Sequence, residues 1–351
     1  MAGELSMKIL IHTHWCYPYR KAGSERYTHH VAKYLVSQGH EVWYLCWPDI
    51  GEAAGQVDFF QDGCRVIVER PGLDILAHYD WADLVWSHLS NTRICIDNVQ
   101  KVRRPLVNVL HNGGALAHYK VKPKEVDLLV YNSEWLKNKT EPRFTPKQSH
   151  VLIPPFSVAE FECSDENKRF ITHINCNDGK GVMFSRHYAK DLPQYEFLFQ
   201  MGHYFTQLCP RGTHRELMKY QVDLKEIDFP DNCVYNPLTT NMTEEVYSRT
   251  KVLVCPSAID TWGMVCLEAM ASGIPVICHP DHGFLESCGK AGIFIDRKKA
   301  HVMKAMLIKL MEDESFYKQQ SDRSRARALE VETLAQAQLE QLEQKLQELR
   351  V

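Results

Sequence analysis

The chain has 351 residues, which is too long for one compact core and suits two α/β domains of ordinary size. It is 44% hydrophobic and 24% charged, the composition of a globular protein. A net charge of −3 does not demand a polyanionic partner. The charge is uneven, because residues 93–150 hold 11 basic and 5 acidic side chains. Such an excess is typical of a solvated face, and a surface that meets an anionic acceptor is the alternative.

The twelve cysteines are scattered singly and form no Cys-x-x-Cys pair. Cys46, Cys255 and Cys278 lie in or beside apolar runs, where a thiol packs as a small hydrophobe. This pattern indicates a reducing compartment. Neither a signal peptide nor an apolar run of about 18 residues is evident, so we expect a cytoplasmic protein without a transmembrane segment.

The first half of the chain begins with an apolar strand over 7–11, a helix over 25–38 and a second strand over 41–45. A strand, a helix and a strand in this order predict a parallel sheet. Further strands are expected at 64–68, 84–87, 106–110, 128–131 and 150–153. We therefore predict a Rossmann-like domain over 1–160, followed by a polar linker over 156–168.

A second series of strands and helices follows the predicted linker. Helices are expected after Lys180 and over 264–272, and strands at 170–174, 196–200, 232–235, 251–255, 275–278 and 292–295. This alternation predicts a doubly wound domain over 168–315. The segment 316–351 reads as helical, and the spacing of Leu339, Leu342, Leu346 and Leu349 favours packing on the protein's own body over a coiled coil.

The strongest functional signal lies between the expected strand 251–255 and the helix that begins near Met264. The connecting loop holds Asp260 and Gly263, and ligands of open parallel sheets bind where such strands end. The glycine lets the backbone approach a ligand, and the amides at a helix N-terminus attract anions. Glu268, one turn into the helix, can accept hydrogen bonds from a diol such as ribose. One carboxylate at a helix start is explained equally well by capping, whereas two around this turn make capping a much weaker explanation and favour a ligand site.

This segment resembles the retaining GT-B glycosyltransferases of the large family four, the glycosyl transferases group 1. Their hallmark is an acid, seven residues and a glutamate, matched here by Asp260 and Glu268, with Asp260 where glutamate is usual and Trp262 where phenylalanine is common. The resemblance extends over most of the chain, through 22–25, 38–42, 105–111, 131–134, 179–181 and 283–292. It implies an α/β GT-B fold: two Rossmann-like, doubly wound domains that face each other across a cleft, with C-terminal helices. The domain over 1–160 would then bind the acceptor, and the domain over 168–315 the nucleotide sugar.

The resemblance also implies roles for individual residues. Glu268 would hold the donor ribose, Asp260 the hydroxyls of the transferred sugar, and Lys180 the leaving diphosphate. Gly23 would let the first loop approach the diphosphate, and His111 would lie beside the reacting sugar. The remaining donor contacts would come from the backbone of Trp262, Gly263, Met264 and Val265. The implied catalytic residues are His111, Asp260 and Lys180.

The sequence predicts that neither a metal nor another cofactor takes part. There is no Asp-x-Asp motif to clamp a diphosphate through a metal, and preorganised donors with a lysine can stabilise the departing charge. Four histidines lack a cysteine or acidic partner at ligand spacing and are interpreted as strand, loop and helix-surface residues: His12, His14, His29 and His30. The chain departs from the family at Asn175, which stands at a position where arginine is common. Charge neutralisation would then rest on Lys180, helix N-termini and Arg186.

The expected activity is transfer of a hexose, with retention, from a nucleoside-diphosphate sugar to a hydroxyl acceptor. A UDP-sugar such as UDP-glucose is the favoured donor, and a glycan or lipid-linked sugar the favoured acceptor. Two alternatives stay open. The basic segment 93–150 would suit glycosylation of a hydroxymethylated base in viral DNA, and Asp260 with Asn175 would suit a catalytically silent nucleotide-sugar-binding module. The sequence leaves the acceptor, the nucleotide, the sugar and the oligomeric state open.

Overall fold

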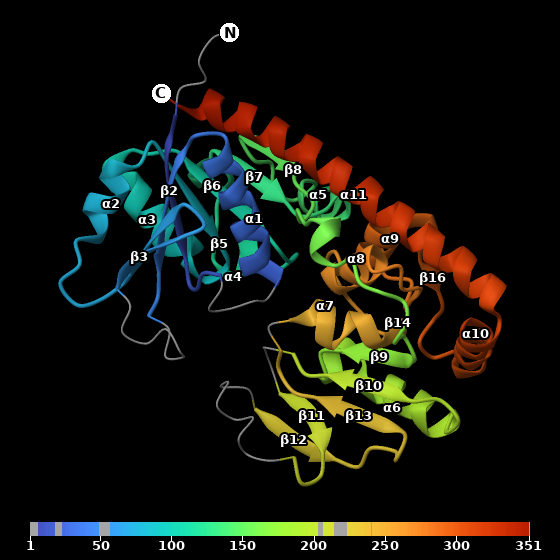
Figure 1. The fold of residues 1–351 in the computed structure, drawn as a ribbon. Coiled ribbons are helices and arrows are strands. Elements are labelled where there is room, and N and C mark those ends of the chain that lie inside the picture. The colour runs from blue at the N-terminus through green and yellow to red at the C-terminus, as the bar shows by residue number, and fades with distance from the viewer. Residues whose placement is uncertain are drawn as a thin grey trace. The chain divides into compact units, whose positions relative to one another are not determined.

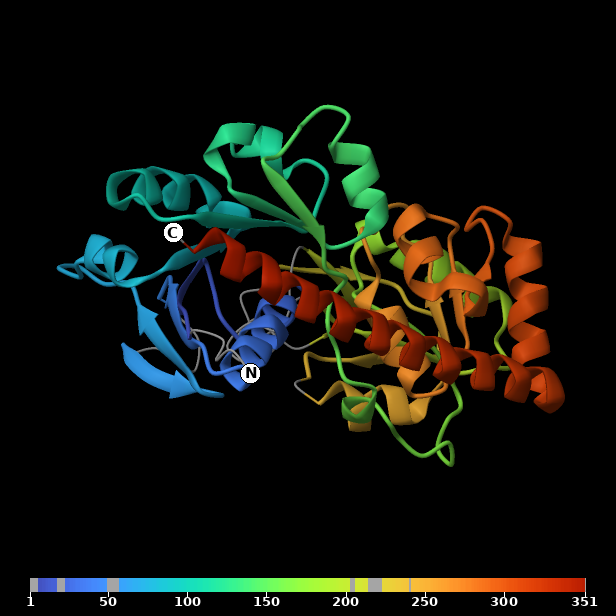
Figure 2. The ribbon, with the colours of Figure 1, turned by 90° about the horizontal axis from the view of Figure 1, so that it is seen from above.

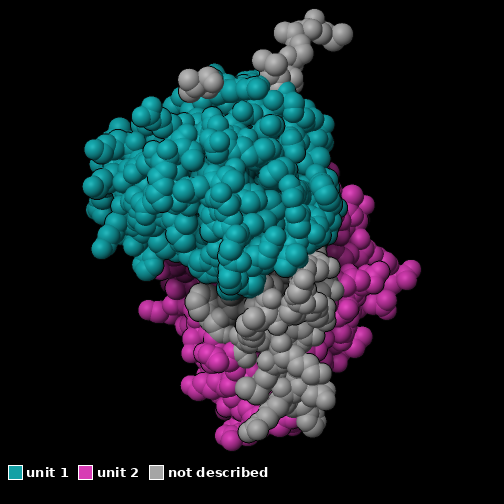
Figure 3. All heavy atoms as spheres, turned by 90° about the vertical axis from the view of Figure 1, so that its left-hand side faces the viewer, with its two compact units in different colours: residues 1–155, 334–351 teal, residues 156–333 magenta. Residues whose placement is uncertain are grey.

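The computed structural model describes residues 6–17, 23–48, 57–202, 206–213, 223–239 and 241–350 (Figures 1 and 2). The chain divides into two compact units, coloured teal and magenta in Figure 3. Unit 1 comprises residues 1–155 and 334–351, and unit 2 comprises residues 156–333. The long last helix, α11 (Glu314–Leu349), therefore begins in unit 2 and ends in unit 1.

Unit 1 is built on an eight-stranded sheet with the order β3-β4-β2-β1-β5-β6-β7-β8. All neighbouring strands are parallel except β3 and β4. The strands are β1 (Lys8–Thr13), β2 (Glu41–Cys46), β3 (Asp58–Gln61), β4 (Cys64–Val68), β5 (Leu84–His88), β6 (Leu106–Leu110), β7 (Leu128–Tyr131) and β8 (Gln148–Val151). Its helices are α1 (Gly23–Ser37), α2 (Ile75–Trp81), α3 (Thr92–Val102), α4 (Ala115–His118) and α5 (Glu134–Thr140).

The core of unit 1 also takes in the end of α11. Leu339, Leu342 and Leu346 are buried in the same hydrophobic cluster as the first strand and α1. Polar contacts fix this part of the helix: the Tyr34 hydroxyl donates to Glu343 at 2.9 Å, and the backbone amide of Ile153 donates to the side chain of Gln338 at 2.8 Å.

Unit 2 is built on a six-stranded sheet with the order β13-β10-β9-β14-β15-β16, all parallel, and β11 and β12 pair separately. The strands are β9 (Phe170–Ile174), β10 (Phe197–Gln200), β11 (Gln207–Pro210), β12 (Leu224–Ile227), β13 (Cys233–Asn236), β14 (Thr250–Cys255), β15 (Val276–Cys278) and β16 (Ile293–Phe294). The helices are α6 (Val182–Asp191), α7 (Met242–Glu245), α8 (Met264–Ala271), α9 (His282–Cys288) and α10 (Ala300–Glu312). Helix α10 packs on this sheet through Met303, Leu307 and Leu310.

The two α/β units with parallel sheets confirm the predicted fold class. Several elements were not predicted. Strand β3 pairs antiparallel with β4 through a two-residue turn, Asp62 and Gly63, both with positive φ, which is a known hairpin signal. The small β11–β12 sheet was also missed, and so were the helices α2, α3, α4, α5, α7 and α9.

The segment 156–168 is not simply a polar linker. Phe156, Val158 and Phe161 are buried, and the amide of Val158 donates to Glu332 at 3.0 Å. These apolar side chains, spaced among polar ones, anchor the segment on unit 2. No helix in the described part of the chain combines the length and the apolar composition that a membrane crossing needs.

Candidate functional site

The strand order of unit 2 reverses between β9 and β14. From β9 the chain moves through β10 to β13, and from β14 it moves the other way through β15 to β16. Ligands of open parallel sheets bind outside the carboxyl ends of the strands at such a reversal. The turn after β9 holds Lys180, and the loop after β14 holds Asp260. The topology therefore places both residues where a ligand is expected.

Lys180 and Asp260 form an ion pair that joins the two loops. The distance between Lys180 Nζ and Asp260 Oδ2 is 2.5 Å. Burial by itself lowers the pKa of Lys180, but the Asp260 carboxylate outweighs it and the pKa is raised, so the lysine is charged at neutral pH. The other carboxylate oxygen, Oδ1, accepts hydrogen bonds from the amides of Gly263 at 2.9 Å and Trp262 at 3.3 Å. Asp260 is thus fixed on both sides.

Three glycines bring the loop backbones into close contact. Gly181 and Gly263 both have φ near +80°, the left-handed region that favours glycine. A Cβ on Gly181 would lie 2.6 Å from the carbonyl oxygen of Pro256, and one on Gly263 would lie 2.6 Å from the Phe284 ring. A Cβ on Gly283 would lie 2.1 Å from the carbonyl oxygen of Asp260. The loop after β14 is therefore held between α6 and α9.

The other predicted donor residues lie on the same loop or on α8. Met264 and Val265 are partly buried in the first turn of α8, and Trp262 is buried just before it. Glu268 is only 3% exposed, and its Oε2 accepts a hydrogen bond from the Tyr247 hydroxyl at 2.6 Å. Tyr247 was not identified from the sequence. It orients the carboxylate that the family resemblance assigns to the ribose.

Residue 175, where the family often has arginine, is an asparagine that fixes the local backbone in this chain. Asn175 has a φ of +71°, a conformation that asparagine tolerates better than most residues. Its Oδ1 accepts from Asn177 at 2.6 Å and from Gln207 at 2.9 Å. Arg186 donates to the carbonyl of Asp228.

Arg297 is a cation near the site that was not predicted from the sequence. Its Nη1 donates to the Pro256 carbonyl at 3.2 Å, at the base of the loop after β14.

Unit 1 has a reversal of its own, between β1 and β5. His14 follows β1 and His88 ends β5, with their ring centroids 5.4 Å apart. His88 also lies 5.1 Å from the ring of His111, which follows β6. His14 Nε2 is 3.2 Å from Glu25 on α1. The carboxyl edge of this sheet therefore carries three imidazoles and one buried carboxylate.

Burial determines the charge of this imidazole group. It lowers the pKa of His111 to about 3, with His14 as a second cause, and holds the pKa of His88 well below its usual range. For Glu25, burial alone would raise the pKa, but the hydrogen bond from His14 outweighs it and the pKa is lowered. At neutral pH His88 and His111 are therefore uncharged and Glu25 is ionised.

The expected placement of the other histidines was partly wrong. His12 and His14 have acidic partners, Glu69 at 2.6 Å and Glu25 at 3.2 Å, that are distant in sequence. His29, interpreted as a helix-surface residue, is buried and lies 3.2 Å from Asp62.

Gly23, predicted to let the first loop approach the diphosphate, begins α1. It has no described atom within 4 Å of its Cβ position.

The basic segment 93–150 is partly neutralised within unit 1. Arg93 contacts Asp97 at 2.6 Å and Glu125 at 3.3 Å. Arg104 pairs with Asp80 and Lys147 with Asp127. These pairs weaken the case for a nucleic-acid surface, which needs basic groups that can meet phosphates.

Residues 230–327 match the family described as Glycosyl transferases group 1. The curated proteins include the O-antigen chain mannosyltransferase B of Escherichia coli, 26% identical over 110 residues, a match that covers 31% of this chain and 25% of that protein. The match thus spans about a quarter of that relative's length.

Two solved structures share the fold over nearly their whole length. Sucrose-phosphate synthase from Thermosynechococcus elongatus superposes with a TM-score of 0.70 at 14% identity, covering 97% of this chain and 99% of that one. Anabaena HepE in complex with UDP-glucose gives a TM-score of 0.71 at 15% identity, with 96% and 99% covered. These structures show that the chain has the GT-B fold, and within it residues 230–327 match the glycosyl transferases group 1.

Proposed function

We propose that the chain transfers a hexose from a UDP-sugar to a hydroxyl acceptor, with retention and without a catalytic metal. In this reaction the bond from the anomeric carbon to the diphosphate oxygen breaks and a bond to the acceptor oxygen forms on the same face. The acceptor's proton passes to the leaving phosphate oxygen. The group that must be stabilised is therefore the departing diphosphate.

The carboxyl edge of the unit 2 sheet supplies positive charge for that diphosphate. Lys180 is held there by Asp260 at 2.5 Å, and Arg297 lies at the base of the same loop. The first amides of α8 add a partial positive charge next to Gly263. Preorganised cations and amides of this kind stabilise a leaving group without reorganisation. Asp260, freed from Lys180 when the diphosphate arrives, would accept hydrogen bonds from the sugar hydroxyls.

The carboxyl edge of unit 1 suits a neutral partner. His88 and His111 are uncharged at neutral pH, so they can donate or accept hydrogen bonds without attracting a second diphosphate. Within the described residues, both ring nitrogens of His88 and Nδ1 of His14 are buried and have no hydrogen-bond partner. Buried polar atoms are normally satisfied, which supports a polyhydroxyl ligand at this edge.

The observation that carries the proposal is the Lys180–Asp260 pair at the strand-order reversal of unit 2. The test is a screen of nucleotide sugars against glycan, lipid-linked and small hydroxyl acceptors, read by release of the nucleoside diphosphate. We expect release from UDP-glucose or a related UDP-hexose that depends on the acceptor. NMR of the product should show the anomeric configuration of the donor.

Metal independence has its own experiment. Turnover should be unchanged when Mg²⁺ or Mn²⁺ is supplied, and treatment with EDTA should not create a requirement for either ion. Activity that EDTA abolishes and Mg²⁺ or Mn²⁺ restores would contradict the metal-free mechanism. Tight binding of UDP-glucose without any release of UDP would identify a binding module in place of an enzyme.

A further inference from the structure

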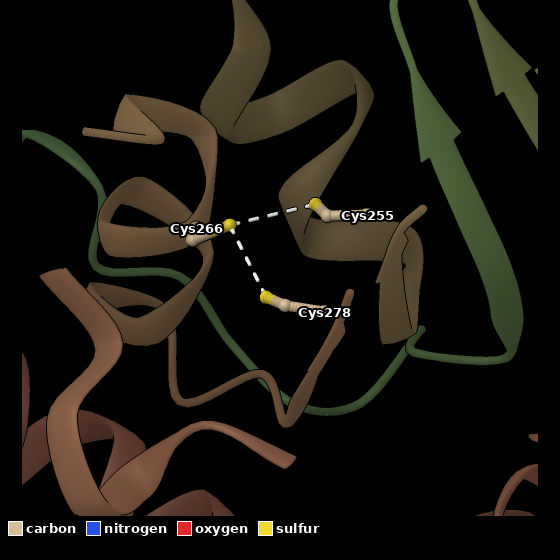
Figure 4. Close-up of side chains that lie close together, drawn as sticks. All are labelled: Cys255, Cys266 and Cys278. Atoms are coloured by element: carbon tan, nitrogen blue, oxygen red, sulfur yellow. Dashed lines mark hydrogen bonds between the residues drawn. The ribbon is translucent and has the colours of Figure 1, made fainter. Parts of the chain in front are cut away.

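Four cysteines lie close together beneath the loop after β14, although they are too far apart in the sequence to form a metal-binding motif. Cys255 ends β14, Cys266 lies in the first turn of α8, and Cys278 ends β15. Their sulfur atoms all lie within 4.8 Å of one another and point toward a common centre (Figure 4). Cys288, the last residue of α9, joins them through a contact with Cys278. All four side chains are buried.

Three of the separations between sulfur atoms are close to those of a tetrahedral metal site. Cys255 and Cys266 have their Sγ atoms 3.4 Å apart, Cys266 and Cys278 3.8 Å, and Cys278 and Cys288 3.9 Å. A tetrahedral zinc ion has Zn–S bonds of about 2.3 Å, which places its sulfur ligands about 3.8 Å apart. An iron–sulfur cluster would need space between the sulfurs for its own iron and sulfide atoms, and these separations do not leave it.

The surroundings can carry the charge of bound thiolates. The Arg327 guanidinium caps the end of α9 next to Cys288, donating to the carbonyls of Ser287 at 2.9 Å and Glu286 at 2.7 Å. Four thiolates bound to one Zn²⁺ carry a net negative charge, and the Arg327 cation at the edge of the cluster offsets part of it.

We propose that Cys255, Cys266, Cys278 and Cys288 bind one structural zinc ion. Zn²⁺ replaces the four thiol protons, which are released to solvent, and no electron is transferred. The ion joins the ends of two strands, the start of α8 and the end of α9. These are the elements that hold the loop with Asp260, so the metal stabilises the donor site and takes no part in the transfer.

The four cysteines did not suggest a metal in the sequence because they are 11, 12 and 10 residues apart. Zinc motifs are recognised by pairs two to four residues apart. In this chain the parallel sheet brings the ligands together, and no local pair is needed. The neighbouring strands β14 and β15 end at the same edge, which places Cys255 next to Cys278.

The first experiment measures metal in the full chain purified under reducing conditions. We expect about one zinc per chain by plasma mass spectrometry, as in structural sites. Replacement by Co²⁺ should give the intense thiolate-to-cobalt absorption of a tetrahedral sulfur site. A chain that stays free of zinc after reconstitution, or that binds iron in its place, overturns the proposal. So does a disulfide among the four cysteines in the reduced protein.

The second experiment separates ligation from packing. Cys266→Ser and Cys278→Ser should each lower zinc occupancy at least about tenfold, since each removes a ligand. Cys176→Ser is the matched control, because Cys176 is also buried in unit 2 but lies outside the cluster, and it should keep its zinc. Equal occupancy in all three variants overturns the assignment. If the ligand variants do not fold, the zinc content and cobalt spectrum of the unmodified chain decide.

Discussion

The two sheets reverse their strand order in the same way, yet the side chains at the two reversals differ in charge. In unit 2 the edge carries a fixed ion pair, Lys180 and Asp260, on backbones packed together by glycines. In unit 1 the edge carries imidazoles that burial keeps neutral, His88 and His111. The same topology thus presents a charged edge in one unit, where we propose that the diphosphate binds, and an uncharged polar edge in the other. Topology determines where a ligand binds, and side-chain chemistry determines which ligand.

The largest effect should come from removing the charged residues of unit 2. Lys180→Ala or Glu268→Ala should lower transfer at least about a hundredfold, the scale of losing one charge-stabilising group, while circular dichroism shows an intact fold. Lys190→Ala is the control for the lysine, because Lys190 is exposed near the far end of α6. Near-normal turnover in either site variant would remove that residue from the donor site.

A methyl group on Gly181 should disturb the same edge through the backbone. In Gly181→Ala the new Cβ meets the Pro256 carbonyl at 2.6 Å and the residue keeps an unfavourable φ, so we expect a loss of about 2 kcal/mol in unfolding free energy. Gly72→Ala is the control, since Gly72 has a φ of +85° and no described atom within 4 Å of its Cβ position. Equal losses in the two variants would show that strain in φ, and not the contact with Pro256, determines the cost.

In unit 1, His111→Ala should slow turnover more than it weakens donor binding. We expect kcat to fall by about tenfold, the effect of losing a hydrogen bond that forms beside the reacting sugar, with little change in the Kd for UDP-glucose. Because burial lowers the pKa of His111 to about 3, its ionisation should not appear in the kcat profile between pH 5 and 8. A variant that loses donor affinity but keeps its turnover at saturation would exclude this role.

The smallest expected effect concerns stability in mild acid. Burial lowers the pKa of His173 in unit 2 to about 4, while the unfolded chain takes up the proton near its usual value. Stability is therefore complete above about pH 6.5 and falls as the pH drops toward 4, by about 1 kcal/mol for one histidine between pH 7 and 5.5. Urea unfolding of the unmodified chain and of His173→Gln at both pH values measures this. An identical pH dependence in the two proteins would show that His173 makes no such contribution.

Much of the fold follows from local pattern. Apolar runs such as 106–110, 128–131 and 170–174 coincide with β6, β7 and β9, because strands buried in a parallel sheet are apolar along their whole length. Strand β3 was missed because it lies at the sheet edge and its side chains are only partly buried or exposed. A short edge strand carries little apolar signal, and only its Asp62–Gly63 turn could have revealed it.

The candidate site was predictable only where its residues lie close together in the sequence. Asp260, Gly263 and Glu268 belong to one strand-loop-helix unit, which the sequence displays directly. Tyr247 and Arg297 reach the site from separate elements. Their contacts depend on how the strands are ordered in the sheet. The same is true of the pair formed by His14 and Glu25, which required α1 to fold over the end of β1.

A crystal structure with bound UDP tests the central claim most directly. We expect the diphosphate to lie at the carboxyl edge of the unit 2 sheet, within hydrogen-bond distance of Lys180 Nζ and the first amides of α8. The ribose hydroxyls should contact the Glu268 carboxylate, with Tyr247 still donating to its other side. UDP bound at the imidazole edge of unit 1, or bound in unit 2 while Lys180 makes no contact with a phosphate, would contradict the account.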